Sequence, residues 1–331
     1  MRTVLQALVF VALFTASSAT NTSTLHLGED NRGREIYIKY ETSGHNDGND
    51  VLVFYDNYFG LISWIPIQLS LRETNYTIAL EVIGFGYSSG HRKSDLEGIG
   101  GFPAYSFDQL AYFVYQALTI LQPKGRIHFV GTELAAFVGI HYHLLYNESP
   151  YRFERMLFES PSLDPIVDPI WDYRDSTKPD ITNWLTGELT NDPDQTLKNM
   201  YEGFFGPGRI VLEYVAVSYA KIAHMDALLS IELSMYDNDL AVLAKQVTIP
   251  VHVIYCSLNS PVMIVECQNV YDWIYGFSVC QMVIQPIIDY SLSVPDVTYT
   301  LAPSHSSVVH VSDPSGYLNI LRDFFGGPKL S

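Results

Sequence analysis

The stretch that decides the fold is residues 127–146, with the sequence IHFVGTELAAFVGIHYHLLY. Its start, Ile127–Val130, is a short and mostly apolar run of the kind that forms buried parallel strands. Leu134–Tyr146 then has the length and the apolar content of a helix. The turn between them, Gly131–Ala135, has small residues at both ends and Glu133 at its centre. We therefore predict a sharp strand–turn–helix unit that presents the Glu133 side chain at the end of a strand.

Strand and helix patterns alternate on both sides of this unit. The predicted strands are Leu25–Leu27, Glu35–Tyr40, Val51–Tyr55, Tyr76–Val82, Ile127–Val130, Met156–Phe158, Val251–Cys256 and Val297–Leu301. The predicted helices are Phe107–Leu121, which follows Ser106 as its N-cap, Leu134–Tyr146 and Ser315–Phe325. This alternation predicts an α/β fold with a mostly parallel central sheet and helices on both faces.

The composition is that of a globular protein with a strong negative charge. Of its 331 residues 47% are hydrophobic, which is enough for one packed core. There are 36 acidic and 19 basic residues, so the formal net charge is −17. This charge opposes binding to nucleic acid, because contacts with phosphates need clustered lysines and arginines. We therefore expect no nucleic-acid partner, and the sequence leaves the oligomeric state open.

The pattern changes between Pro161 and Lys245. Prolines and aspartates cluster first, and the segments that follow have helical spacing without a convincing strand. We expect a helical cap that is inserted into the sheet domain. The expected organisation is a leader over residues 1–19, a first core part over 20–160, the cap over 161–245 and a second core part over 246–331.

The first residues have the pattern of a signal peptide. Arg2 precedes the apolar run Val4–Phe14, and small residues follow up to Ala19, after which we expect cleavage. The run is too short to span the hydrocarbon core of a bilayer, which is about 30 Å thick. Three N-glycosylation sequons are typical of the same secretory route. They begin at Asn21, Asn75 and Asn147. We expect a secreted glycoprotein.

The chain has three cysteines, Cys256, Cys267 and Cys280. In an oxidising compartment Cys267 and Cys280 can pair, while Cys256 lies in an apolar strand; three reduced core cysteines are the alternative. The sequence contains no CxxC motif and no His/Cys spacing of a metal site. We expect neither a metal nor another cofactor.

Two further features fall where strands are expected to end. The loop Glu81–Ser88, with the sequence EVIGFGYS, follows the fourth strand, and His305 lies between the last strand and the last helix. Together with the turn around Glu133, their order resembles that of the α/β-hydrolase superfamily, in which the nucleophile stands on such a turn. The resemblance implies the α/β-hydrolase fold with an inserted helical cap.

Within that superfamily the chain most resembles the haloalkane dehalogenases and the related coelenterazine luciferases. The most specific stretch runs from Phe129–Ala135 through Leu157–Ser160, and the similarity extends to Trp171 and Glu202–Phe205. The resemblance implies that Glu133 stands at the nucleophile position, where the family has an aspartate.

The same resemblance implies roles for four more residues. Glu159, at the end of the sixth strand, corresponds to the acid partner of the catalytic histidine, and His305 corresponds to that histidine. Asn57 corresponds to a residue that binds the leaving halide or an oxyanion, although a Tyr-Asp pair replaces the His-Gly pair that precedes it in the family. Leu134 stands where the family has a tryptophan that donates to the leaving group, so this donor is missing.

Two classes of function remain open. The first is an enzyme, either a hydrolase or a cofactor-independent oxygenase of the luciferase kind, with the Glu133 carboxylate in the nucleophile position. The second is a catalytically inactive protein of the same fold that binds an apolar ligand or a protein partner. The joint presence of Glu159, His305 and Asn57 favours the enzyme, whereas Leu134 and the longer side chain of Glu133 favour the binder. For the enzyme we expect a small apolar molecule in a pocket under the cap.

Overall fold

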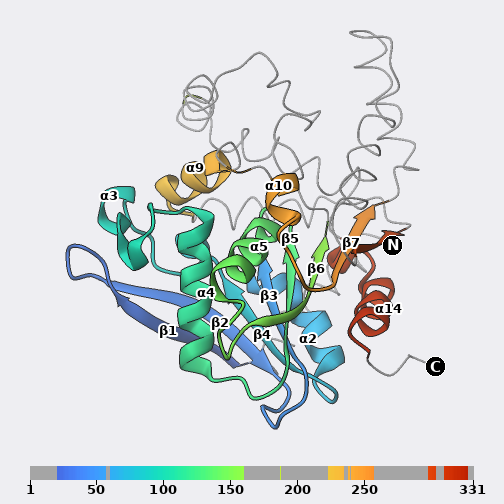
Figure 1. The fold of residues 1–331 in the computed structure, drawn as a ribbon. Coiled ribbons are helices and arrows are strands. Elements are labelled where there is room, and N and C mark those ends of the chain that lie inside the picture. Colours follow the sequence, from blue (N-terminus) through green and yellow to red (C-terminus); the bar gives the residue numbers. More distant parts are fainter. Residues whose placement is uncertain are drawn as a thin grey trace, which may run out of the picture.

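The structure is a computed structural model that describes residues 21–56, 60–159, 187, 223–234, 238, 240–256, 297–302 and 309–326. These residues form an open sheet of eight strands with helices on both sides (Figure 1). The strands are β1 (Asn21–Glu29), β2 (Glu35–Ser43), β3 (Val51–Asp56), β4 (Tyr76–Glu81), β5 (Ile127–Thr132), β6 (Phe153–Glu159), β7 (Val251–Cys256) and β8 (Val297–Ala302).

The sheet order is β1-β2-β4-β3-β5-β6-β7-β8. Strand β2 is antiparallel to both β1 and β4, and the pairs from β4 onwards are parallel. The chain turns from β3 outward to β4 and then returns to β5 on the other side of β3. In open α/β sheets, ligands bind beside the carboxyl ends of the strands at such a reversal. The topology therefore directs attention to the ends of β3, β5 and β6.

All eight predicted strands are present, which confirms the predicted fold class. Several strands extend further than their apolar runs. In particular, β5 continues to Thr132 and β6 continues to Glu159, and these two residues lie opposite each other in the parallel register. Backbone pairing therefore carries two polar residues to the end of the sheet, although the hydrophobic pattern stops earlier.

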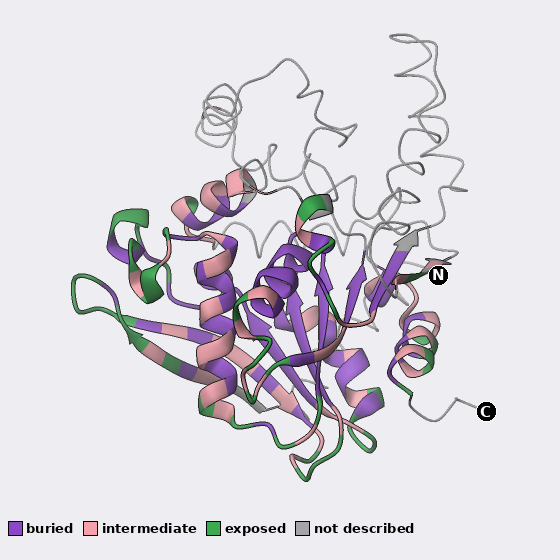
Figure 2. Ribbon diagram, viewed as in Figure 1, coloured by how far each residue is buried: buried purple, intermediate pink, exposed green. Residues whose placement is uncertain are grey.

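Helices cover both faces of the sheet. On one face lie α4 (Phe107–Leu121) and α5 (Ala135–Tyr146), and on the other lie α2 (Ile65–Leu71) and α14 (Pro314–Phe325). The central strands β3, β4 and β5 are almost entirely buried, as Figure 2 shows. The shorter described elements are η2 (Leu61–Trp64), α3 (Lys93–Leu96), η3 (Ile99–Gly101), α9 (Met225–Ser234), α10 (Leu240–Ala244) and α13 (Val309–Ser312).

Side-chain caps define where two of the helices begin. The Ser106 hydroxyl accepts a hydrogen bond from the Gln109 N–H, which confirms the predicted start of α4. The Asp313 carboxylate accepts one from the Gly316 N–H, so α14 begins at Pro314, one residue before the predicted start.

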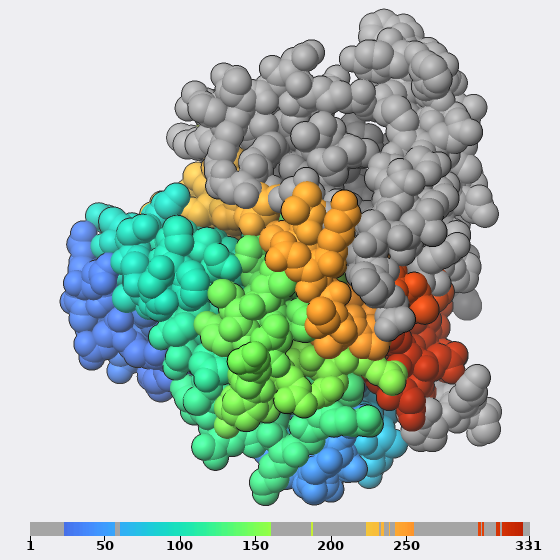
Figure 3. Space-filling view, in the orientation of Figure 1, coloured from blue at the N-terminus to red at the C-terminus, as the bar shows by residue number. Residues whose placement is uncertain are grey.

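Most of the predicted cap lies outside the described residues, as do residues 1–20, Trp171, Cys267 and Cys280. Within the cap range the structure describes α9 and α10, which lie near the carboxyl ends of the strands (Figures 1 and 3). The His224 N–H donates to the Gly84 carbonyl at 2.7 Å, and the Asp226 carboxylate accepts from the Lys93 N–H at 2.8 Å. The start of α9 is therefore bound to the loop after β4 and to α3. No described helix is long and apolar enough to cross a membrane.

Candidate functional site

The turn between β5 and α5 holds Glu133 in an unusual backbone conformation. Its φ is 48°, in the left-handed region that residues other than glycine rarely adopt. The Glu133 N–H donates to the Glu159 carbonyl at 3.0 Å, and the Glu133 carbonyl accepts from the Ala136 N–H at 3.1 Å. A strained residue of this kind persists only where its surroundings hold it, and such residues cluster at functional sites.

Close packing explains the small residues on either side of this turn. A Cβ atom on Gly131 would lie 2.7 Å from a ring carbon of Phe129 and 3.0 Å from the Ala135 Cβ. Gly131 therefore has no room for a side chain where the strand passes beneath the first turn of α5. The pattern that identified this turn in the sequence is a steric requirement of its geometry.

Leu134 stands at the start of α5 with only 2% of its surface exposed. The first N–H groups of a helix have no partner within the helix, and the partial positive charge there favours anions. The Leu134 side chain adds no hydrogen-bond donor. Any stabilisation of negative charge at this position must therefore come from the backbone.

The Glu159 carboxylate holds a histidine. One oxygen accepts from the His310 backbone N–H at 2.9 Å, and the other is 2.6 Å from His310 Nδ1. Both side chains have an exposed fraction of 0%. His310 lies in α13, between β8 and α14, which is the part of the chain where the resemblance predicts the catalytic histidine. The predicted residue itself, His305, lies outside the described residues, as does Asn57.

The His310 ring belongs to an aromatic layer. It is stacked on the Trp64 indole, with ring centres 4.0 Å apart and an angle of 11° between the planes. Trp64 is also stacked on Phe54 of β3 at 4.7 Å, and Tyr317 of α14 lies 5.7 Å from the His310 ring. Burial, with the nearby charge of Glu159, raises the pKa of Tyr317 well above its usual range. The Tyr317 phenol therefore stays protonated.

Several buried polar atoms in this region have no hydrogen-bond partner among the described residues. They are His310 Nε2, Trp64 Nε1, the Tyr317 hydroxyl and the Thr132 hydroxyl. Most buried polar atoms in folded proteins do have a partner, so a group of exceptions beside one imidazole calls for an explanation. Trp64 and Tyr317 lie against the His310 ring, and Thr132 lies opposite Glu159 at the end of β5, so this cluster is the candidate functional site.

Asp56 adds a further carboxylate at the end of β3. It is 1% exposed, and one of its oxygens accepts a hydrogen bond from the Ser63 hydroxyl at 3.3 Å. Tyr55, before it, is 3% exposed. The pair that replaces the family's His-Gly is therefore buried in the sheet.

The loop after β4 has a structural role. The Glu81 carboxylate accepts from the Tyr87 N–H at 2.8 Å and from the Ser88 hydroxyl at 2.9 Å. Gly84 and Gly86 have φ values of 82° and 54°. The carboxylate and the two glycines shape the loop, and this explains the motif without a catalytic function.

Two other histidines that lie close in sequence bind to separate elements. His141 Nδ1 is 2.6 Å from the Asp108 carboxylate at the start of α4, and His143 Nε2 is 3.1 Å from the Thr248 hydroxyl. They face different neighbours because they stand two residues apart on a helix. Within the described ranges, no group of three metal-ligating side chains is found.

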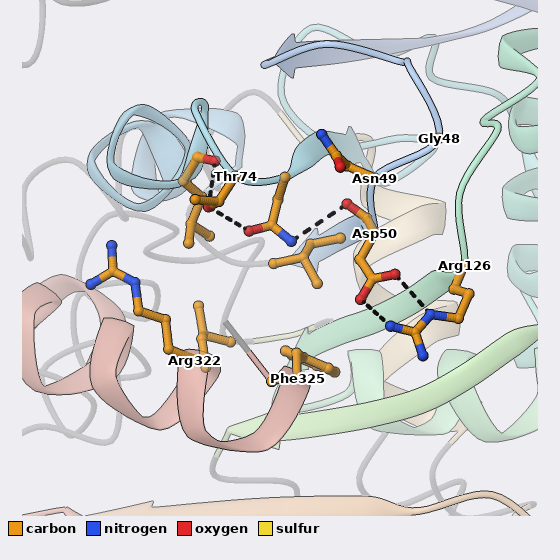
Figure 4. A pocket seen from close by; sticks show the side chains of 12 residues that line it. Gly48, Asn49, Asp50, Thr74, Arg126, Arg322 and Phe325 are labelled. Carbon is orange, nitrogen blue, oxygen red and sulfur yellow. Dashed lines mark hydrogen bonds and ion pairs between the residues drawn. The ribbon is translucent and has the colours of Figure 1, made fainter. Parts of the chain in front are cut away.

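A surface hollow among the described residues lies elsewhere. It measures about 420 Å³ and is lined by residues such as Asp50, Thr74, Arg126 and Arg322 (Figure 4). Asp50 and Arg126 form a two-pronged ion pair with N–O distances of 2.9 and 2.8 Å. These residues precede β3 and β5, so the hollow opens at the amino ends of the strands, opposite the cluster around His310.

Solved structures share this architecture. A bromoperoxidase from Bacillus anthracis matches with a TM-score of 0.65 and 17% identity, over 92% of this chain and 100% of that chain. An esterase from Thermogutta terrifontis matches with a TM-score of 0.67 and 13% identity, over 92% and 98%. An enol-lactonase from Burkholderia xenovorans matches with a TM-score of 0.60 and 13% identity, over 88% and 97%. The chain has the α/β-hydrolase fold.

These likenesses establish the fold and nothing finer. No protein-family model and no curated protein sequence matches the chain. Within the α/β-hydrolase fold, the turn around Glu133 occupies the place of the nucleophile elbow, after the strand that borders β3 and before the next helix. The structure brings Glu133, Leu134 and Glu159 to the adjoining ends of β5 and β6.

Sequence reasoning missed His310. Both His305 and His310 lie between β8 and α14, so their order along the chain fits either of them. The distinguishing signal is weak: His310 stands four residues before Pro314, within one short helical turn that leads into α14. Only the contact with Glu159 separates the two.

Proposed function

We propose that the chain is a secreted enzyme of the α/β-hydrolase fold that uses the Glu133 carboxylate as a nucleophile on a small apolar substrate. The observation that supports this most is the backbone of Glu133, which is held at a φ of 48° between β5 and α5. This is the conformation in which an elbow exposes its central side chain at the end of the sheet. Gln122 has a similar φ of 47° as the C-cap of α4, so the support comes from this conformation at the turn between a strand and a helix.

The proposed reaction has two steps. A Glu133 oxygen attacks an electrophilic carbon, so that a C–O bond forms and the bond to the leaving group breaks with its electron pair. An imidazole then takes a proton from water, and the hydroxide attacks the carbonyl carbon of the Glu133 ester. The alkyl oxygen leaves as an alcohol with one proton, Glu133 returns as a carboxylate, and the imidazolium releases the other proton to solvent.

Three further groups complete the proposed site. Glu159 orients the imidazole, for which His305 and His310 are the two candidates. The N–H groups at the start of α5, beginning with Leu134, favour negative charge on the leaving group or on the oxyanion. Asn57, in the segment after β3, is the proposed side-chain donor. The substrate would lie between the strand ends and the cap.

The covalent step can be tested with a short-chain alkyl iodide such as 1-iodobutane. We expect wild type to form an ester on the peptide that contains Glu133, and Glu133→Gln to lose it, since an amide is a poor nucleophile of almost the same shape. Glu73→Gln is the matched control, because the Glu73 side chain is 81% exposed and precedes β4, at the amino ends of the strands and opposite Glu133. An unchanged peptide mass in wild type, with no halide release, would contradict the proposal.

The length of the carboxylate arm offers a second test. Glu133→Asp restores the shorter side chain of the resembled family, and a displacement of about 1 Å can change a rate about 100-fold. We therefore expect halide release to rise in this variant, and to rise again when Leu134→Trp adds an indole donor. If neither variant releases halide, a catalytically inactive protein that binds an apolar ligand or a protein partner is the better description. The missing side-chain donor at Leu134 is the observation in its favour.

Secretion is part of the same proposal. Expression of the full chain in a eukaryotic host should yield protein in the medium with its N-terminus near Thr20. Intact-mass measurement after removal of N-linked sugars would show this. Protein that remains in the cells and keeps Met1 would contradict it.

A further inference from the structure

The segment between β8 and α14 contains two histidines, and the structure describes the contacts of one of them, His310. His310 is fully buried and donates two hydrogen bonds to one carboxylate, through its backbone N–H and through Nδ1. We propose that His310, in place of His305, is the general base of the site, and that Trp64 is the residue that positions its ring. This rests on the proposed covalent mechanism through Glu133.

The bond to Glu159 sets the tautomer of the ring. An ionised carboxylate only accepts, so Nδ1 must donate at 2.6 Å. In the neutral ring Nε2 then carries the lone pair. Nε2 is buried and has no hydrogen-bond partner among the described residues. A general base needs this arrangement: one nitrogen held by an acid, and the other free to take a proton.

The same carboxylate also fixes the backbone that carries the ring. Because Glu159 accepts from the His310 N–H at 2.9 Å, it binds the first turn of α13 as well as the imidazole. The proton that Nε2 takes up would produce an imidazolium, and the Glu159 charge stabilises that form. Replacement of the acid would therefore disturb both the position and the chemistry of the ring.

The hydrogen bonds to Glu159 leave the plane of the His310 ring free to rotate, and stacking on Trp64 fixes this plane. The indole is stacked on the imidazole at 4.0 Å with an angle of 11°, and Phe54 stacks on the indole in turn. Trp64 is 1% exposed and lies in η2, directly after the segment that contains Asn57. The imidazole is thus held at one edge by Glu159 and on one face by Trp64.

The position of Glu159 connects this ring to Glu133. The Glu159 backbone carbonyl accepts from the Glu133 N–H at 3.0 Å, while its side chain holds His310. Thr132, next to Glu133, lies opposite Glu159 in the register of β5 and β6. One residue therefore places both the proposed nucleophile and the proposed base.

The base is tested with His310→Phe and His305→Phe in the full chain, each treated with 1-iodobutane. Formation of the ester does not need the base, but its hydrolysis does. We expect the Glu133 ester to accumulate in His310→Phe and to turn over in His305→Phe as in wild type. Accumulation in His305→Phe alone would overturn the assignment and leave the proposed function intact. No halide release from wild type, together with no ester in either variant, would overturn the proposed function as well as the role of the base.

The positioning role of Trp64 needs its own measurement. Trp64→Leu should slow ester hydrolysis by about 10- to 100-fold, in line with a small misplacement of a reacting group, without changing the rate of ester formation. Trp64→Phe, which keeps an aromatic face, should recover most of the rate. Phe54→Leu is the matched control, because Phe54 belongs to the same stack and packs on Trp64. An equal decrease in the rate of ester hydrolysis in Phe54→Leu and Trp64→Leu would show that Trp64 contributes only to packing.

A nuclear magnetic resonance measurement reads the ring without requiring activity. With ¹⁵N-labelled histidine, and with His310 assigned by its loss in His310→Phe, wild type should show a protonated Nδ1 and an unprotonated Nε2. Glu159→Gln should give a mixture of tautomers, whereas Trp64→Leu and Phe54→Leu should keep the single one, because the acid sets the tautomer. A wild-type ring protonated only at Nε2 would contradict the assignment, even if the ester were found.

Discussion

Two buried carboxylate–histidine pairs in this molecule look alike and differ in what surrounds them. Asp30 lies 2.8 Å from His91 Nδ1 at the turn between β1 and β2, and Glu159 lies 2.6 Å from His310 Nδ1 at the end of β6. His91 Nε2 also has a partner, the Ser89 hydroxyl at 2.9 Å. His310 Nε2 has none among the described residues.

The acids differ in the same way. Asp30 accepts from the side chain of Arg34, from its N–H and from the Arg32 N–H, in addition to His91. Glu159, within the described part of the chain, binds only His310 through its carboxylate. A fully satisfied network holds a structure together, whereas an imidazole with an acid behind it and a free nitrogen is arranged for proton transfer. The number of satisfied atoms and the position at the strand ends together separate the two roles, because His141 Nε2 also lacks a partner among the described residues but its pair joins α4 and α5.

The largest expected effect is a loss of stability when the fully hydrogen-bonded pair of Asp30 and His91 is broken. Asp30→Asn keeps the shape of the side chain but removes the charge that faces Arg34 and His91. Loss of one partner from a buried pair typically costs about 3–5 kcal/mol, so we expect the free energy of unfolding to fall by about 4 kcal/mol. Urea denaturation at neutral pH would measure it. A loss below about 1 kcal/mol would mean that this network contributes no more than a surface ion pair.

Histidines that are buried without a full set of partners should make the fold sensitive to acid. Burial lowers the pKa of His128 to about 4, against the opposing effect of Asp50. In the unfolded chain its pKa is about 6.5, so the unfolded state binds more protons between these values and stability falls as the pH drops from about 6.5 to about 4. The expected loss is about 3 kcal/mol.

Urea denaturation at pH values on either side of this interval would measure how steeply the free energy of unfolding falls with pH. His128→Phe, which keeps a ring against Phe325, should lessen the slope. An unchanged slope would assign the acid sensitivity to other groups, of which His252 is the first candidate, because burial lowers its pKa to about 4 as well.

The pair of Glu159 and His310, whose Nε2 has no described partner, should contribute less to the free energy of unfolding. Glu159→Gln retains an oxygen for the His310 N–H and loses only the bond to Nδ1, so we expect a decrease of about 1–2 kcal/mol in the free energy of unfolding. The same variant should strongly reduce ester hydrolysis. A stability loss as large as that of Asp30→Asn, with ester hydrolysis unaffected, would make the two pairs equivalent and both structural.

The smallest effect on stability is expected for a third acid–histidine pair, which joins helices α4 and α5. His141 lies 2.6 Å from Asp108, whose side chain is 38% exposed. Solvent weakens such a contact, so Asp108→Asn should change the free energy of unfolding by less than about 1 kcal/mol. It should leave ester formation and hydrolysis unchanged. A clear loss of activity here would show that an acid–histidine pair can affect the reaction from outside the strand ends.

Much of the fold could be predicted because its determinants are local. The apolar run before Gly131, the small residues of the turn and the cap at Ser106 each act within a few residues of sequence. Glu133, Leu134 and Glu159 were placed together because parallel strands bring their carboxyl ends to one edge of a sheet. The exact ends of β5 and β6 were missed, since pairing between strands extends them past their apolar residues.

By itself, then, the sequence determined the order of strands and helices, the strained turn at Glu133 and the acid at the end of β6. These follow from hydrophobic period, from the size of Gly131 and Ala135, and from the position of a residue relative to its own strand. Only the tertiary structure decided which histidine Glu159 holds and which of its nitrogens is free. His310 and Glu159 are separated by 151 positions in the chain, and no local pattern specifies a contact over that distance. The packing of α13 between Glu159 and Trp64 specifies it, because a buried imidazole must find its partners in three dimensions.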